Sequence, residues 1–428
     1  MSNRFSKVII MSAFVFVLSA CMGNDAASTA PTASMNENNN AISKEEVTFS
    51  APTENALSEE SLDYLGAFRL PEDGEDERNM FSWGGEALAY SPNSHTLFIV
   101  GHNWYTNIAE ISIPEPIISK DLSKLNQAGI IQDFKDIRSE NFGDWDMEIP
   151  RVGLEVVGDT LYYCFGEHFE EKTNKGTHGF SDLRLNPNTT VCIAGDYLYS
   201  TNDYLFAVPK NWQASFGGRN LLTGRFRDGG WSGMGPSLFA IKTEDIISAD
   251  DDERIDATPI LLYDDSYSGD TGQKMIGYSH ADTISGGAFV DCDSGSAVIF
   301  AATHGFGNTW YGFANGVVYP IDVEEDAVYP SVPPYPYDER GWWNDDFRAA
   351  FVLYDPAYLV KVFSGEYAVN SPQPYAIVDL SEYMLAKRED TSMVYLGGLA
   401  YDVAQNRLYV LELFADGDKP VVHVFSFN

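Results

Sequence analysis

Gly-Gly-Ala-Phe-Val-Asp (286–291), a polar turn and Val-Ile-Phe-Ala-Ala-Thr-His (298–304) form a unit that recurs along this chain of 428 residues. Each unit has a strand that begins with small residues, a turn and a second apolar strand. The other copies are Gly-Glu-Ala-Leu-Ala-Tyr (85–90) with Leu-Phe-Ile-Val-Gly-His (97–102), Val-Gly-Leu-Glu-Val-Val (152–157) with Leu-Tyr-Tyr-Cys-Phe-Gly-Glu-His (161–168), and Gly-Gly-Leu-Ala-Tyr-Asp (397–402) with Leu-Tyr-Val-Leu-Glu-Leu (408–413). Such self-similarity indicates a repeat architecture.

Short strand candidates between turns of Gly, Asn, Asp and Pro fill the rest of the chain, and residues 118–127 and 380–387 are the exceptions with helical periodicity. This pattern predicts an all-β fold. The repeated hairpins favour a β-propeller, whose blades surround a central channel. Roughly 370 residues at about 40 to 50 per blade predict seven blades, with eight as the alternative. The last strand, 421–427, is expected to complete a blade begun near 65–70 and so to close the ring.

The N-terminus predicts a lipoprotein signal peptide over residues 1–20. A basic start and an apolar run precede Leu18-Ser19-Ala20-Cys21, which resembles the lipobox of bacterial lipoproteins. Lipidation of Cys21 with two or more acyl chains, palmitate among them, would anchor the protein stably. We expect the outer membrane, facing the periplasm or the medium; an ordinary secretory signal is the alternative. Residues 21–60 are expected to form a disordered tether, and residues 61–428 one propeller domain.

The charge and the cysteines exclude several classes of protein. A formal net charge of −36, from 63 acidic and 27 basic residues, argues against nucleic acid as a partner, because that binding relies on Lys and Arg. Such acidity is common in secreted proteins of marine bacteria. Three cysteines remain after lipidation, so disulfides do not define the fold. The chain lacks the motifs of serine hydrolases, nicotinamide enzymes and zincins. A monomer is expected.

Histidines and arginines are the candidates for chemistry. His102, His168 and His304 end corresponding repeats, so they could converge on one site, where histidine suits acid or base work. Arg184 follows His168 beyond an exposed loop, and a guanidinium can hold a carboxylate or sulfate. The predicted catalytic residues are His102, His168 and Arg184. The predicted substrate-binding residues are His178, Tyr204, Arg225, Arg227, Trp231, His304 and Tyr311. Packing roles and pairing with local acids are the alternatives for each residue.

Acidic loops offer oxygen ligands that suit Ca²⁺. They are Asp264-Asp265 with Asp270, and Asp250-Asp251-Asp252-Glu253. We expect solvated loops or at most a structural Ca²⁺, and no cofactor that catalysis requires. Three convergent histidines holding a transition metal are a further option.

A propeller with His and Arg at its channel, on a lipoprotein of marine character, resembles the β-propeller polysaccharide lyases, particularly the ulvan lyases of marine bacteria. The resemblance implies seven blades around a groove with histidines, tyrosines and an arginine. Within this resemblance, His102 corresponds to the histidine of the groove, and Arg184 corresponds to the arginine that neutralises a carboxylate. His168 stands where the family has a catalytic tyrosine; this is a departure from the pattern, and Tyr162, Tyr163 or Tyr204 could supply the phenol.

The leading hypothesis is therefore a polysaccharide lyase that cleaves an anionic, uronate-containing and ulvan-like polysaccharide by β-elimination. Arg184 would neutralise the uronate carboxylate, and a His or Tyr would remove the C5 proton. The first alternative is a non-catalytic surface propeller that binds glycan or protein. The second is a metal-dependent hydrolase.

Overall fold

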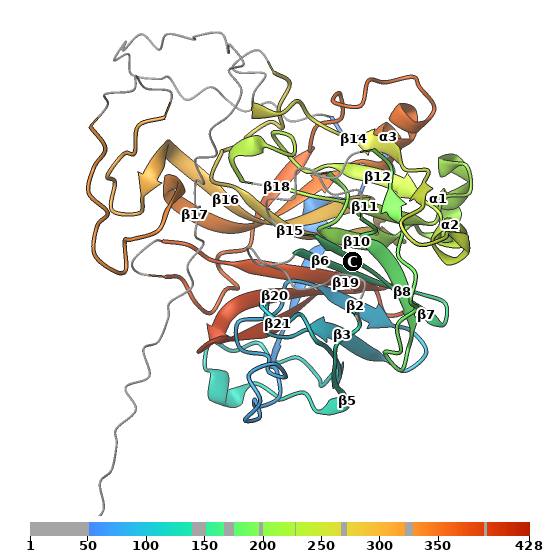
Figure 1. Ribbon diagram of the computed structural model, residues 1–428, viewed down its shortest axis with the longest axis horizontal. Coiled ribbons are helices and arrows are strands. Elements are labelled where there is room, and N and C mark those ends of the chain that lie inside the picture. Colours follow the sequence, from blue (N-terminus) through green and yellow to red (C-terminus); the bar gives the residue numbers. More distant parts are fainter. Residues whose placement is uncertain are drawn as a thin grey trace, which may run out of the picture.

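The computed structural model describes residues 51–138, 151–166, 175–196, 200–226, 228–266, 272–321, 328–388 and 392–428. Within them, five sheets of three or four strands surround one axis, and Figure 1 looks along it. The inner strands of successive sheets pack side by side, and the last packs against the first. This closed ring is a β-propeller, which confirms the predicted fold class.

Each blade begins with its inner strand. Blade 1 contains β2 (Leu88–Ser91), β3 (Thr96–Val100), β4 (Ile108–Ser112) and β5 (Ile130–Lys135); blade 2 contains β6 (Arg151–Val157), β7 (Thr160–Gly166) and β8 (His178–Asp182); blade 3 contains β10 (Tyr204–Ala207), β11 (Leu221–Gly224), β12 (Leu238–Ile241) and β14 (Thr258–Leu261). Blade 4 contains β15 (Thr283–Cys292), β16 (Gly295–Phe313), β17 (Arg340–Tyr354) and β18 (Ala376–Asp379); blade 5 contains β19 (Leu396–Asp402), β20 (Arg407–Asp416), β21 (Lys419–Phe427) and β1 (Leu62–Arg69). A separate parallel pair joins β9 (Ile193–Ala194) to β13 (Arg254–Ile255).

The quoted repeats form the inner and second strands of blades 1, 2, 4 and 5. The prediction of seven blades is not confirmed, because the structure has five. Inner strands begin at residues 88, 151, 204, 283 and 396, so a blade with its connections uses more chain than the expected 40 to 50 residues. Long connections on the outside of the ring account for the difference.

The double glycines of the repeat allow inner strands to approach one another at the axis. The Gly398 amide donates to the Gly85 carbonyl at 2.9 Å. A Cβ atom at Gly398 would lie 2.5 Å from the backbone nitrogen of Leu88, closer than side-chain carbons come. The glycines by which the repeat was recognised are thus required for the inner strands to pack closely.

Blade 5 closes the ring as predicted, because β1 pairs antiparallel with the C-terminal strand β21. A buried network crosses this blade. The Tyr64 hydroxyl lies 2.9 Å from His423 Nδ1, and His423 Nε2 lies 2.8 Å from Glu412 Oε2. Glu412 also accepts the amides of Leu385 and Ala386. The two ends of the folded chain are therefore joined by a ladder and by buried polar contacts.

The helices are short. They are η1 (Glu59–Ser61), η2 (Leu122–Lys124), α1 (Lys210–Gln213), η5 (Ala214–Phe216), η6 (Asp228–Gly230), α2 (Thr243–Ser248) and α3 (Pro356–Phe363). Helix α3 forms in a part of the chain where only strands were expected, because the Asp355 carboxylate caps the Ala357 amide and Pro356 occupies the first turn. The helical patterns at 118–127 and 380–387 yield η2 alone within the described chain.

The chain contacts blade 4 earlier than the expected boundary at residue 61. Thr53 donates its amide to Asp355 at 2.8 Å, and Leu57 is buried in the core beside blade 4. Residues 53 and 57, which were expected to belong to the tether, therefore contact the propeller. The predicted signal peptide and Cys21 lie outside the described residues. No helix among the described residues is long and apolar enough to cross a membrane.

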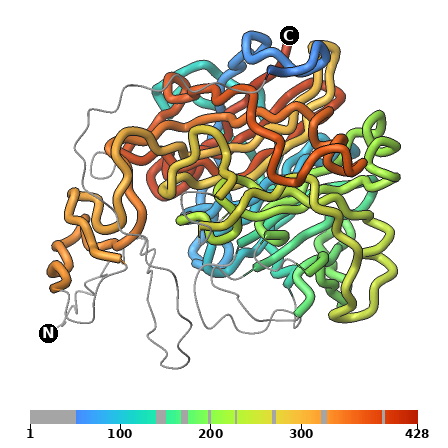
Figure 2. The backbone as a smooth tube through the Cα atoms, turned by 90° about the horizontal axis from the view of Figure 1, so that it is seen from above, coloured from blue at the N-terminus to red at the C-terminus, as the bar shows by residue number. Residues whose placement is uncertain are grey.

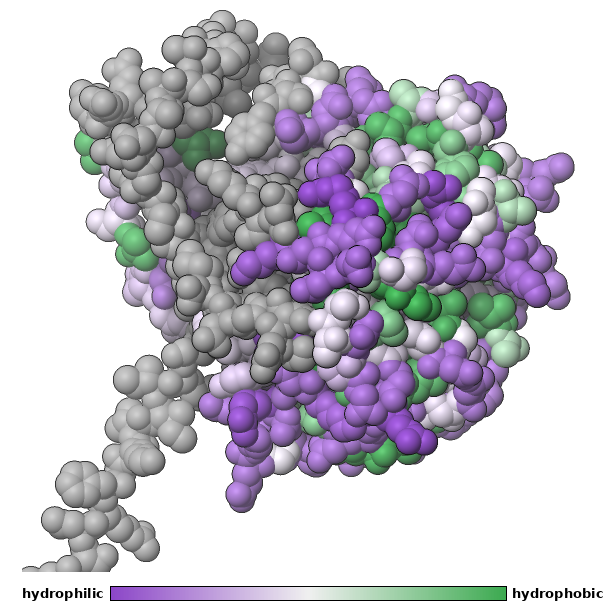
Figure 3. Space-filling model, turned by 45° about the vertical axis from the view of Figure 1, so that its right-hand side comes forward, coloured by the Kyte–Doolittle hydropathy of each residue, from purple (hydrophilic) through white to green (hydrophobic). Residues whose placement is uncertain are grey.

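Strands β16 and β17 extend past the ring as an arm, of which residues 305–321 and 328–347 are described and drawn in orange in Figures 1 and 2. We call the side of the ring where inner strands begin the mouth face, and the side with the turns at 92–95, 158–159, 293–294 and 403–406 the hairpin face. Figure 3 shows mainly hydrophilic residues on the side that it presents, with small apolar patches between them.

Candidate functional site

A histidine and an aspartate are paired at the mouth face of blade 4. His304 Nδ1 lies 3.0 Å from Asp282 Oδ1, and their side chains are 15% and 1% exposed. Asp282 is fixed in turn, because it accepts the amides of Gly305 at 2.8 Å and Ser279 at 2.9 Å. A carboxylate that accepts from Nδ1–H leaves Nε2 as the basic nitrogen of the ring. The pair therefore has the arrangement of an oriented general base.

The environment of His304 sets its proton affinity. Burial lowers the pKa of His304, but the charge and hydrogen bond of Asp282 outweigh burial and raise it above its ordinary value. Arg348 acts in the lowering direction. A histidine tuned by a specific carboxylate at the end of a strand is a candidate for proton transfer.

Arg348 lies directly across from His304 in the β16–β17 ladder. Its guanidinium carbon lies 4.0 Å from the centre of the Phe306 ring. Its Nη1 is 3.2 Å from Asp379, in a surface pair whose side chains are 49% and 45% exposed. Such exposed pairs contribute little to stability, so a substrate carboxylate can compete for the guanidinium beside the histidine.

Aromatic side chains gather next to this pair. We call Trp231, Tyr278, His280, Tyr311 and Trp342 the aromatic cluster. The His280 ring stacks on Trp342 with centres 4.4 Å apart, and the Tyr311 ring is 5.4 Å from Trp342. The Tyr278 hydroxyl lies 3.2 Å from His280 Nδ1. Trp231 is 39% exposed. Partly exposed rings of this kind offer flat apolar faces with polar edges.

The glycine-rich loop predicted around Trp231 brings it to the cluster. Gly229 and Gly230 have φ of 72° and 75°, which side-chain-bearing residues rarely adopt. A Cβ atom at Gly229 would lie 2.9 Å from Trp342 Nε1 and 3.4 Å from the Trp231 ring. The loop backbone thus approaches the rings closely, and the Gly229 amide donates to the His280 carbonyl at 2.8 Å.

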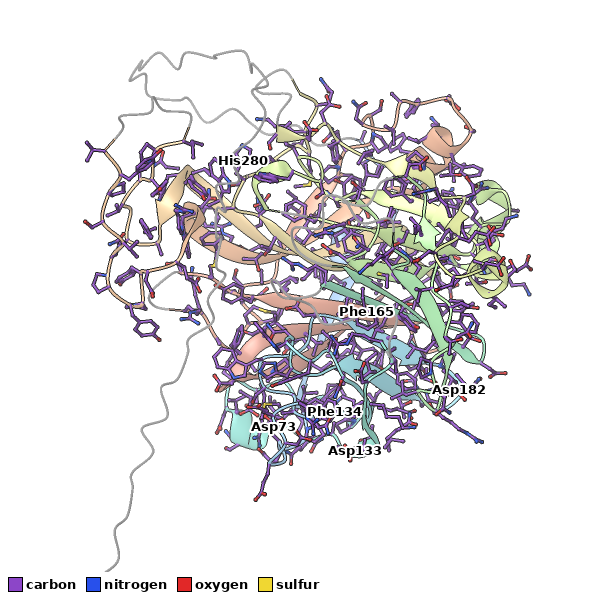
Figure 4. All side chains as sticks on the ribbon, in the orientation of Figure 1. Asp73, Asp133, Phe134, Phe165, Asp182 and His280 are labelled. Carbon is purple, nitrogen blue, oxygen red and sulfur yellow. The ribbon has the colours of Figure 1, made fainter. Side chains whose placement is uncertain are left out.

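One turn holds both the pair and the cluster. It runs from Tyr278 to Asp282, and the Asp282 amide donates to the Ser279 carbonyl at 3.1 Å. Ser279 Oγ also donates to Asn344 of the arm at 2.6 Å. Because the turn carries His280 and Asp282 two residues apart, it fixes the stacked ring and the base together. Figure 4 labels His280 at this junction of blade 4 with its arm.

A second charged group lies at the mouth of the channel, and we call it the mouth cluster: Glu86, Arg151, Asp203 and Arg225. Glu86 Oε2 is 3.9 Å from Arg151, and Asp203 Oδ1 is 3.5 Å from Arg225 Nε. Burial raises the pKa of Glu86, Arg151 opposes this shift, and the Asp203 charge adds to it. The carboxyl groups of Glu86 and Asp203 therefore have different surroundings, and the charge of Asp203 acts on Glu86.

Three predicted binding residues are buried and cannot contact substrate in this structure. His178 lies between blades 2 and 3, with Nε2 2.8 Å from Thr223 and Nδ1 2.9 Å from Thr177. The Tyr204 hydroxyl donates to the Ser237 carbonyl at 2.8 Å inside the core. Arg225 has a 0% exposed side chain and donates to Asn202 at 3.0 Å. Each of the three side chains bonds to other groups of the protein.

The two predicted catalytic residues that the structure describes, His102 and Arg184, do not meet. His102 follows β3 at the mouth face, where its ring lies 5.3 Å from Tyr105, and burial lowers its pKa. Arg184 is exposed in the turn after β8, whose last residue Asp182 pairs with Thr160 beside the hairpin. Figure 4 shows Asp182 at the outer edge of the ring, away from His280. His168, Arg227 and Cys21 lie outside the described residues.

The contacts of His102 and His304 share no residue, so the described part of the chain gives no support to a histidine metal site. It also contains no group of three or more His, Cys, Asp or Glu side chains that could hold a metal ion. In the acidic loops, Asp251 accepts the Val191 amide at 3.2 Å and Asp264 accepts the Gln273 amide at 2.8 Å. Asp270 is not among the described residues.

Sequence reasoning identified His304, Trp231 and Tyr311 but missed Asp282, Arg348, Tyr278, His280 and Trp342 as members of one site. A polar Asp immediately before the Gly-Gly strand was a usable signal for Asp282. Arg348 could not be paired with His304 without the register of β16 and β17, which a bulge between Phe306 and Thr309 shifts.

His178 predicts an acid-sensitive stability. Burial lowers its pKa to about 3, so below about pH 6.5 the unfolded chain binds a proton that the folded protein does not. The stability advantage of the wild type over His178→Gln should therefore narrow by ~1.4 kcal/mol per pH unit as the pH falls from 6.5. Urea unfolding of both proteins at pH 7 and pH 5 measures this.

The two proteins have to be compared with each other, because burial also raises the pKa of Glu155 to about 8. That shift makes the folded protein more stable as the pH falls, and it is the same in both proteins. A gap that does not change with pH would show that His178 is protonated in the fold.

Comparison with known proteins adds little. No protein-family model matches the chain, and no curated protein matches it. Among solved structures, a glycosyl hydrolase from Bacteroides ovatus is similar, with a TM-score of 0.38 and 12% sequence identity over 90% of this chain and 96% of that chain. A likeness of this size decides nothing about activity, which has to be argued from the residues of this chain.

Proposed function

We propose that this protein is a polysaccharide lyase that cleaves uronate-containing chains by β-elimination at the mouth face of blade 4. The observation that carries the proposal is the Asp282–His304 pair with Arg348 directly across the ladder. The aromatic cluster on the same turn supplies flat faces for sugar rings. This arrangement replaces the pairing of Arg184 with His102 and His168 that the sequence predicted.

The chemistry follows from the three side chains. Arg348 would bind the uronate carboxylate and lower the energy of the anion that forms at C5. His304 Nε2 would remove the C5 proton, while Asp282 stabilises the resulting imidazolium. The electron pair forms the C4–C5 double bond as the bond from C4 to the glycosidic oxygen breaks. The proton on His304 then passes to the departing oxygen, so the base returns to its starting state. No cofactor takes part in these steps.

Hydrolysis is the second candidate, and the mouth cluster favours it. Glu86 has a pKa raised by burial, and Asp203 is close to Arg225. Glycoside hydrolysis uses two carboxyl groups in different surroundings. In this case His304 would not take part in the reaction.

The products distinguish these functions. Purified protein is incubated with ulvan, alginate or pectin, and both absorbance near 235 nm and new reducing ends are followed. The lyase reaction yields both signals in equal molar amounts, because each cleavage creates one unsaturated uronate. Reducing ends without absorbance would overturn β-elimination and support the mouth cluster. Binding without either signal would support a non-catalytic surface propeller.

The proposal includes the setting that the sequence predicts. Lipidation at Cys21 would hold the propeller at the outer membrane, where an anionic polysaccharide or its fragments can reach the mouth face. The net charge of −36 would repel such a chain at low salt, and marine ionic strength would screen this repulsion over a few ångströms.

A further inference from the structure

A second group of aromatic residues lies at the mouth face, where blade 5 meets blade 1. Trp83 precedes β2 of blade 1, and Phe414 lies within β20 of blade 5. Their rings are 5.6 Å apart in an edge-on arrangement, and the Tyr395 ring is 5.8 Å from Phe414. All three side chains are partly exposed. We call them the blade 1–5 rings.

Two of these residues have a backbone conformation that aromatic residues rarely adopt. Trp83 has a φ of 64° and Phe414 a φ of 60°. Glycine or asparagine would occupy such positions at lower cost. Phe414 lies in the irregular stretch between Glu412 and Asp416, where the β20–β21 ladder is interrupted. Conformations of this kind persist where surrounding contacts impose them, and they gather at ligand sites.

The surrounding contacts hold the backbone in place. The Trp83 amide donates to the Asp418 carbonyl at 2.8 Å, and the Trp83 carbonyl accepts from Asn103 at 3.0 Å. The Leu413 amide donates to the Tyr395 carbonyl at 2.8 Å. Trp83 and Phe414 belong to none of the buried hydrophobic clusters of the described chain. Burial in the core therefore does not explain why two rings occupy strained positions.

A packed bridge connects the two aromatic groups. Tyr395 and Trp342 both pack against the buried cluster formed by Trp343, Phe347 and Met393. Tyr395 thus reaches Phe414 on one side, and Trp342 reaches His280 on the other. The two aromatic groups therefore border the same buried cluster, and ring contacts continue from Tyr395 through Phe414 to Trp83.

We propose that the blade 1–5 rings are a second sugar-binding subsite, and that one polysaccharide chain spans both aromatic groups. Aromatic faces suit the apolar faces of pyranose rings, and a run of them suits a polymer more than a single sugar. The inference rests on the proposed function for the class of ligand, and it adds that the protein binds the interior of long chains.

The test measures binding in a background without turnover. In His304→Gln protein, ulvan polymer and a purified ulvan tetrasaccharide are titrated by calorimetry, with and without Phe414→Gly or Phe414→Asn. Both substitutions remove the ring and fit a positive φ. We expect about tenfold weaker polymer binding, unchanged tetrasaccharide binding at the aromatic cluster, and an unchanged or higher melting temperature. Tyr335→Ala, an exposed ring on the arm, serves as the control and should bind both ligands as before.

The outcomes separate this inference from the lyase. If wild-type protein cleaves ulvan and Phe414→Gly binds polymer within twofold of its parent, the second subsite is wrong and the lyase stands. If no polymer is cleaved but Phe414→Gly loses polymer binding, the subsite stands and the lyase is wrong. A melting temperature that falls by several degrees in both Phe414 variants would show that the ring holds blade 5 together, which overturns the subsite. Failure of the polymer to bind at all would overturn it too.

Discussion

His304→Ala is expected to lower kcat/KM for uronate elimination by about 100- to 10,000-fold, the range that removal of a general base gives. The substitution removes Nε2, which takes the C5 proton, and leaves Asp282 with the Gly305 and Ser279 amides. Substrate binding through Arg348 and the aromatic cluster should persist, so kcat should fall more than KM rises. Initial rates at 235 nm over a range of polymer concentrations measure both quantities.

Two controls make this result specific. His95→Asn changes an exposed histidine at the hairpin face whose φ of 54° suits asparagine, and it should leave the rate unchanged. Arg348→Met and Arg184→Met compare the two arginines. The first should lower kcat/KM, whereas the second should not, because Arg184 lies at the outer edge of blade 2. A loss confined to Arg184→Met would restore the site predicted from sequence.

Glu412→Ala is expected to destabilise the protein by about 3 to 5 kcal/mol, the cost of breaking a buried charged network. Glu412 and His423 are completely buried, and the carboxylate accepts from Leu385, Ala386 and His423. Alanine leaves these donors unpaired in the blade that closes the ring. Chemical denaturation followed by tryptophan fluorescence measures the change.

Glu412→Gln is the matched control, because it keeps the shape and one acceptor oxygen while removing the charge. It should cost less than Glu412→Ala. Equal stability of Glu412→Ala and the wild type would mean that the closing blade does not depend on this network. Neither variant should change the pH dependence of activity, because the charged groups that shift the pKa of His304 are Asp282 and Arg348, and Glu412 is not among them.

The sequence predicted the propeller and its closure because both depend on local patterns. Paired apolar strands and small residues at the axis recur as the ring requires, and β1 and β21 are recognisable strands at the two ends. The number of blades was not predictable in this way. Blade 3 lacks the repeat motif, and the arm and α3 lengthen blade 4, so a length per blade taken from regular propellers gave too many.

The repeat also predicted where side chains meet the mouth face, but not what they do there. Among the described residues, the repeats place His102, His304 and Glu412 at corresponding positions, and Arg225 follows the second strand of blade 3, which lacks the motif. Only His304 has an oriented carboxylate partner at a partly exposed end. Arg225 and Glu412 are buried in polar networks of the protein. Burial and cross-strand register decided these roles, and neither is readable from a single sequence.

The most direct measurement of the central claim is the pH dependence of kcat/KM for wild type and Asp282→Asn, followed at 235 nm. The base must be neutral, so activity should rise with pH through the pKa of His304, which Asp282 raises above its ordinary value. Without the carboxylate, burial dominates and lowers that pKa. The acidic limb of Asp282→Asn should therefore move to lower pH while its plateau rate falls. An acidic limb at the same pH in both proteins would contradict His304 as the base.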